Sequence, residues 1–183
     1  MEEVKGLERK NVALEVLKRL LNDEIRTMEK KFLVKSRSFA KMLEETIKKY
    51  QNQTIEAAQV IAELVELAKK IREEKERGQN MNLTEDEIAF YDALCENETA
   101  IKELGDDTLK KIAQELVMML RKNTSIDWTL KESVRAKLRV YVKKLLNKYK
   151  YPPDKQEQAT KTVLEQAEIL CKDWVGEPMV RWR

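Results

Sequence analysis

One stretch of the chain decides the fold class more clearly than any other: 127-DWTLKESVRAKLRVYVKKLLNKYKYPPD-154. Its apolar residues recur at the three- and four-residue spacing of an amphipathic α-helix. Asp127 is placed to cap the helix N-terminus, and Pro152 and Pro153 cannot continue the helix. We therefore expect one long basic helix that stops at the double proline and is followed by another helix. Its expected buried stripe consists of Val134, Leu138, Tyr141, Leu145 and Tyr149.

The composition of the whole chain agrees with this prediction. The 183 residues include only four glycines and three prolines, too few for the many tight turns of a sandwich or barrel. Strong helix formers dominate instead. The sequence predicts an all-α protein, a bundle of about six to eight helices with no sheet. A linker at 77–82 would divide an N-terminal layer of long helices (1–78) from a C-terminal bundle (79–183), and one continuous helical domain is the alternative.

Several residues carry the signals of helix starts. Thr84 and Glu87 have the spacing of a capping box, in which each side chain bonds the backbone N–H of the other residue. The second helix is expected to begin at Ser36 or Ser38, and the third at Thr54, because hydroxyl side chains favour the N-cap position.

Glycine and proline carry the signals of helix ends. Gly78 and Gly105 are expected to end helices, because glycine adopts the left-handed backbone of a helix C-terminus at little cost. Pro153 fits the first turn of the last helix, where a missing N–H is tolerated. Residues 179–183 are expected to form a tail.

The residue inventory speaks against catalysis. The chain has no histidine, which removes the usual general base near neutral pH and the commonest metal ligand. No glycine-rich phosphate loop occurs, so no cofactor site is expected. Glu63 and Glu66 have the spacing of a carboxylate pair, but they lie on the charged side of their helix and are interpreted as solvated. We therefore assign no catalytic, cofactor-binding or metal-binding residue.

Basic residues concentrate in the 127–154 stretch, although the net charge of the whole chain is only +3. This pattern favours contact with an anionic partner, and a solvated helix face is the simpler alternative. Trp128, Tyr149 and Tyr151 are expected to pack the ends of the basic helix, with base stacking by the tyrosines as the alternative. The candidate partner- or DNA-binding residues are Arg135, Lys137, Arg139, Lys143, Lys144 and Lys148.

The two cysteines indicate the compartment. Cys95 and Cys171 lie among apolar residues and are expected to be reduced and buried. We find no signal peptide and no apolar run near the roughly 20 residues that a membrane span needs. The sequence therefore predicts a cytoplasmic protein without a membrane contact.

Four segments resemble, in the expected order, the C-terminal helical domain of the motor and endonuclease (R) subunit of type I restriction enzymes. They are 11–24, 50–69, 83–94 and 127–154. The similarity covers most of the chain, from Leu7 to Trp174.

The resemblance implies a module of a bacterial defence enzyme that joins the motor to a methyltransferase core of methylation (M) and specificity (S) subunits. The motor and nuclease motifs of such a subunit are missing here, so this chain resembles only a fragment of it. ATP and Mg²⁺ are implied for the parent subunit and for no residue of this chain. The family assigns no catalytic residue to these positions.

Two hypotheses about function remain at this point. In the first, the chain is a docking module whose basic helix meets an acidic surface of the M subunits or nearby DNA phosphates. In the second, it is an autonomous DNA-binding domain without sequence preference, whose affinity falls steeply with salt. No helix-turn-helix signature supports the second hypothesis.

Overall fold

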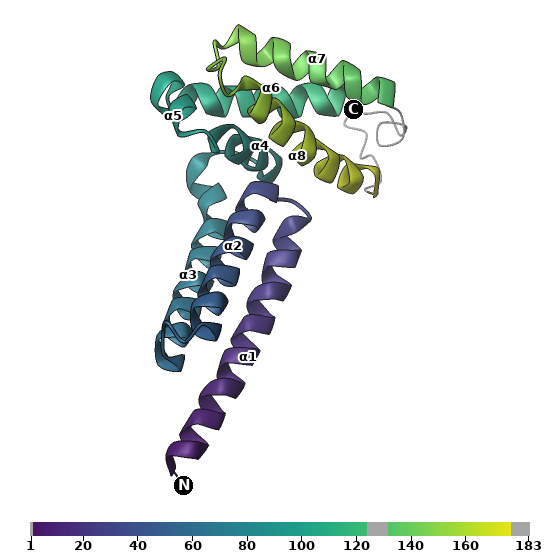
Figure 1. Cartoon of the computed structure of the whole chain (residues 1–183). Coiled ribbons are helices and arrows are strands. Elements are labelled where there is room, and N and C mark those ends of the chain that lie inside the picture. Colours follow the sequence, from purple (N-terminus) through teal and green to yellow (C-terminus); the bar gives the residue numbers. More distant parts are fainter. Residues whose placement is uncertain (1, 124–131, 177–183) are drawn as a thin grey trace. The chain divides into compact units, whose positions relative to one another are not determined.

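The structure is a computed structural model that describes residues 2–123 and 132–176 (Figure 1). Those residues form eight α-helices and contain no β-strand, which confirms the all-α prediction. They group into two compact units: Met1–Glu29 with Lys35–Met81, and Lys30–Val34 with Asn82–Arg183. The helices are α1 (Glu2–Glu29), α2 (Leu33–Gln51), α3 (Ala57–Met81), α4 (Glu85–Cys95), α5 (Glu98–Leu104), α6 (Asp106–Asn123), α7 (Glu132–Lys148) and α8 (Gln156–Gly176).

The first unit is built from α1, α2 and α3, and α1 packs along α3. Each helix is apolar along one side and charged along the other, so three helices together can bury a shared core. Hydrogen bonds and ion pairs then join the helices at the edges, as where Thr46 and Lys49 of α2 meet Glu63 of α3. The buried core consists of Leu14, Leu21, Ile25, Met28, Phe39, Leu43, Val60, Leu64, Leu67 and Ile71.

Two predicted caps in this unit are wrong. α2 begins at Leu33, so Ser36 and Ser38 lie inside the helix, and the Ser36 side chain is fully buried. Thr54 does not cap α3, which begins at Ala57; instead its backbone N–H bonds the Lys49 carbonyl at the end of α2. A hydroxyl side chain favours the N-cap position, but packing against other helices also decides where a helix begins.

The predicted end of α3 is also wrong. The helix continues through Gly78 to Met81, and the left-handed residue after it is Asn82, with φ of 53°. Asparagine is the residue that most often replaces glycine in this conformation. The predicted linker at 77–82 is therefore mostly helical.

The second unit is built from α4 to α8. The short helix α4 packs against both α6 and α8, and α7 packs against α8 and α6. Phe90 and Leu94 of α4 are fully buried at the centre, with Leu109, Ile112 and Leu116 of α6 around them. Val163, Ala167 and Leu170 of α8 belong to the same buried core.

Two short-range signals in this unit are confirmed, and a third is wrong. Thr84 and Glu87 form the predicted capping box at the start of α4. Gly105 ends α5 with φ of 74°, as predicted. α8 begins at Gln156 and not at Pro153, because Pro152 to Lys155 form a turn in which the Lys155 N–H bonds the Pro152 carbonyl.

The buried stripe of α7 differs from the prediction by one position. Leu138, Val142 and Leu146 are buried, whereas Tyr141 is 46% exposed. Residues 140–142 and 145–146 are all apolar, so the sequence fits two neighbouring stripes equally well. Contact with α6 and α8 selects the one that contains Val142. The predicted cap Asp127 and the predicted anchor Trp128 lie outside the described residues, as does the side chain of Val134.

The segment Lys30–Val34, which joins α1 to the first residues of α2, belongs to the second unit. Gln166 of α8 is fully buried and holds this segment by its backbone. Its side-chain amide donates to the Lys31 carbonyl at 2.7 Å and accepts from the Leu33 N–H at 2.9 Å. Phe32 and Val34 pack against the core of the unit. The second unit is therefore completed by a segment distant in sequence.

Candidate functional site

The basic side chains of α7 divide into two groups. Lys137, Arg139, Lys143 and Lys144 make no ion pair with any side chain that the structure describes. All lie outside the buried stripe of the helix, and all except the half-buried Lys143 are exposed. Four positive charges within two helical turns, with no described acid at ion-pair distance, create a positive potential that attracts an anionic group.

The other two candidates have partners within the second unit. The Arg135 guanidinium lies 2.7 Å from the Glu168 carboxylate of α8, and the Lys148 ammonium lies 2.9 Å from the Glu115 carboxylate of α6. These two pairs tie the ends of α7 to its neighbours. Their first role in the structure is to position the helix.

Glu115 links α6 to the end of α7. The Tyr149 hydroxyl donates to its carboxylate at 2.5 Å, and this bond together with that from Lys148 lowers the pKa of Glu115. The Tyr151 hydroxyl donates to the Leu94 carbonyl at 2.8 Å, and Tyr151 is only 2% exposed. Both tyrosines thus contribute to the helix junction, in agreement with the packing interpretation, and the Tyr151 ring is buried while Tyr149 is partly buried.

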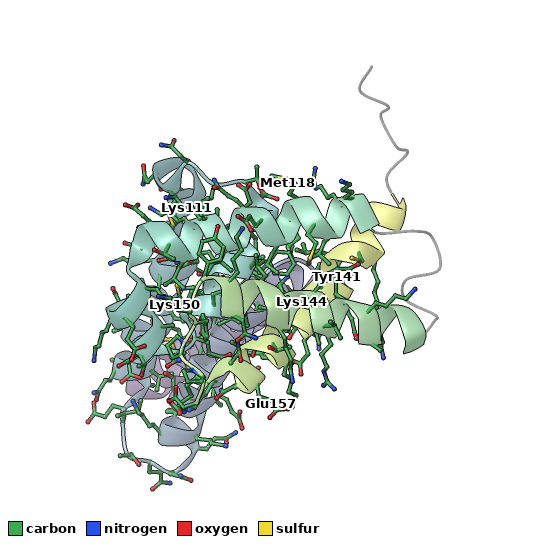
Figure 2. All side chains as sticks on the ribbon, turned by 90° about the horizontal axis from the view of Figure 1, so that it is seen from above. Lys111, Met118, Tyr141, Lys144, Lys150 and Glu157 are labelled. Carbon is green, nitrogen blue, oxygen red and sulfur yellow. The ribbon has the colours of Figure 1, made fainter. Side chains whose placement is uncertain are left out.

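Helix α6 extends the surface on which Lys137 and Lys144 lie, which the sequence reasoning missed. α6 and α7 run side by side and in opposite directions (Figures 1 and 2). Lys111, Met118 and Lys122 lie on one side of α6, and Met118 is 69% exposed. Their spacing of seven and then four residues matches one helix face, so the signal was present in the sequence. An exposed methionine among lysines resembles ordinary surface until a neighbouring helix is known.

The matching side of α7 carries Lys137, Tyr141, Lys144 and Lys148, again at the spacing of one helix face. The Glu115–Lys148 pair lies in the seam between the two helices. Figure 2 looks onto this side and shows Met118 on α6 with Tyr141 and Lys144 on α7. We define the α6–α7 face as Lys111, Met118, Lys122, Lys137, Tyr141, Lys144 and Lys148.

Three carboxylates in the first turn of α4 have structural roles. Glu85 pairs with Lys31 at 2.7 Å and Asp86 with Arg121 at 2.6 Å, while Glu87 completes the cap of α4. Among the described residues, no group of three metal-ligating side chains occurs. Cys95 and Cys171 are both free thiols; Cys171 is buried, and Cys95 is partly exposed.

Comparison with known proteins identifies the family of the chain. The family described as "Type I restriction enzyme HindI endonuclease subunit-like, C-terminal" matches residues 1–173. The chain belongs to this family. The C-terminal resemblance predicted from the four segments is thereby confirmed.

Two relatives support the same assignment. The type I restriction enzyme HindI endonuclease subunit of Haemophilus influenzae is 37% identical over 176 residues, which are 96% of this chain and 17% of that protein. The putative type I restriction enzyme MjaIXP endonuclease subunit of Methanocaldococcus jannaschii is 36% identical over 149 residues, 81% of this chain and 14% of that protein. The chain thus spans less than a fifth of the length of the curated relatives it matches.

One further comparison and one property of the helices complete the description. No solved structure matches this chain. Within the described residues, every helix is too short or too polar to cross a lipid bilayer.

Proposed function

We propose that this chain is a non-catalytic assembly module of a type I restriction endonuclease subunit. It docks the ATP-dependent translocase and endonuclease onto the methyltransferase core of M and S subunits. Nucleotide hydrolysis and DNA cleavage, with their ATP and Mg²⁺, are assigned to the rest of the parent subunit.

The proposal rests on the four basic side chains of α7 that have no ion-pair partner, in a chain that belongs to this family. Lys137, Arg139, Lys143 and Lys144 have no acidic partner among the described side chains, whereas Glu85, Asp86, Glu87 and Glu115 of α4 and α6 are paired or capping. Unpaired charges on a rigid helix suit a partner of opposite charge, because they raise the rate of encounter and orient the docking. The stable core of the second unit supplies the rigid platform.

The same charges also favour a second candidate, sequence-independent binding to duplex DNA. Phosphate contacts by several lysines give affinity without base recognition. The two functions differ in the partner that the isolated chain binds.

Binding of the purified chain to the methyltransferase core and, separately, to duplex DNA distinguishes the two candidates. We expect a complex with the core in sizing chromatography and anisotropy at about 50 and 200 mM salt, and weak binding to DNA whose affinity drops steeply between these concentrations. Reversing the charges of Lys137 and Lys144 to glutamate should weaken the complex and leave the melting temperature nearly unchanged. Tight binding to free duplex with none to the core would contradict the proposal.

Arg135 provides the matched comparison for that variant set. It carries the same charge on the same helix, but it pairs with Glu168. Arg135→Glu would place two carboxylates side by side, so we expect it to lower the melting temperature. This difference separates a loss of binding from a loss of folding.

A further inference from the structure

The α6–α7 face combines exposed apolar side chains with lysines, and this combination says more about the partner than charge alone. Tyr141 is 46% exposed and Met118 is 69% exposed. Val140 of α7 is also exposed (51%), but it lies outside the α6–α7 face. Single exposed apolar residues are ordinary on protein surfaces. Here the two residues lie on one face of two adjacent helices, so their positions relative to each other matter.

The Glu115–Lys148 pair fixes the relative height of the two helices. In antiparallel helices, equal numbers of residues counted from such a pair reach equal heights. Met118 lies three residues from Glu115, and Lys144 lies four residues from Lys148. Lys122 and Tyr141 each lie seven residues from the pair. Met118 and Tyr141 therefore differ by four residues in height, about 6 Å or just over one helical turn, on neighbouring helices.

Lysines surround these two apolar side chains. Lys111 and Lys122 lie on the α6 side, and Lys137, Lys144 and Lys148 lie on the α7 side. The acid in the seam, Glu115, is already bonded to Lys148 and Tyr149. A small apolar centre with a charged rim is the usual anatomy of a protein–protein contact, in which tyrosine and methionine are enriched at the centre.

We infer that the α6–α7 face docks onto a folded protein surface that has an apolar pocket ringed by carboxylates, and that this surface belongs to the M subunit. The inference rests on the proposed function and adds the contact face, its two anchors and the chemistry of the partner. Tyr141 and Met118 fill the pocket, and the lysines meet the carboxylates around it. A DNA backbone fits this face less well, since phosphates would use the lysines and leave the methionine without a counterpart.

The two parts of the face have separate kinetic signatures, and these provide the test. In a protein contact, buried anchors mainly set the rate of dissociation, while rim charges set the rate of association and its salt dependence. We expect the double variant Met118→Ala, Tyr141→Ala to weaken binding to the methyltransferase core by about tenfold or more, at low and at moderate salt. We expect Lys137→Gln, Lys144→Gln to slow association and to reduce its salt dependence.

Alanine at both anchor positions keeps the helices intact, because alanine has the highest helix propensity. Leu20→Ala on α1 is the control, since the exposure of Leu20 (60%) lies between those of Tyr141 and Met118 and it belongs to the first unit, and it should bind as the unmodified chain does. Core binding by the unmodified chain, with unchanged affinity in the anchor double variant, would overturn the inference and leave the proposed function standing. Failure of the unmodified chain to bind the core would refute the proposed function itself, and the inference with it.

Discussion

At the residue scale, two buried groups that can lose a proton make the stability of the second unit depend on pH. Burial raises the pKa of the Tyr151 hydroxyl from 10.0 to about 12 and that of the Cys171 thiol from 9.0 to about 12. Both groups therefore hold their protons more tightly in the folded chain than in the unfolded chain. Their contribution to the free energy of unfolding is complete below pH 9 and is lost as the pH rises toward 12.

Replacing Tyr151 by phenylalanine tests this account. At pH 8 we expect Tyr151→Phe to cost about 1 kcal/mol, because the Leu94 carbonyl loses its hydrogen-bond donor. Above pH 10 the variant no longer has a phenol to ionise, so it should lose less stability with rising pH than the unmodified chain. Urea unfolding at pH 8 and pH 11 measures both effects. Identical pH dependence of the two proteins would contradict the assignment.

At the scale of the element, local and distant contacts explain which predictions are confirmed. The Thr84–Glu87 cap and the Gly105 stop are made by residues a few positions apart, so the sequence alone could specify them. The start of α2, the end of α3 and the buried stripe of α7 depend on packing against other helices. The lysines of α7 could be identified from the sequence. The sequence did not show that Met118 lies beside them, because that depends on the packing of α6 against α7.

The segment held by Gln166 is the clearest distant contact. Gln166→Leu keeps the side chain's size but leaves the Lys31 carbonyl and the Leu33 N–H without their partner, at about 1–3 kcal/mol for each buried group. Gln158→Leu is the control, because Gln158 lies exposed on the same helix. We expect urea unfolding to show a large loss for Gln166→Leu alone, with faster exchange of the Leu33 amide. Equal losses in both variants would argue against the contact.

At the scale of the whole molecule, charge is distributed unevenly in a chain with little net charge. The total is +3, yet residues 135–148 contain six basic residues and no acidic one. The rest of the chain is slightly acidic, so a basic surface and an overall balanced charge coexist. The boundary predicted near residue 78 stays a prediction, as does the docking role. Family membership and the all-α architecture are established.

Competition with the complete endonuclease subunit tests the docking role most directly. The isolated chain is titrated into an assembled restriction enzyme of the same system, and cleavage of plasmid DNA is measured. We predict that cleavage falls as the chain occupies the methyltransferase core, that added endonuclease subunit restores it, and that the Met118→Ala, Tyr141→Ala variant inhibits only at higher concentration. Undiminished cleavage in the presence of a large excess of the folded chain would contradict the claim that this module carries the docking surface.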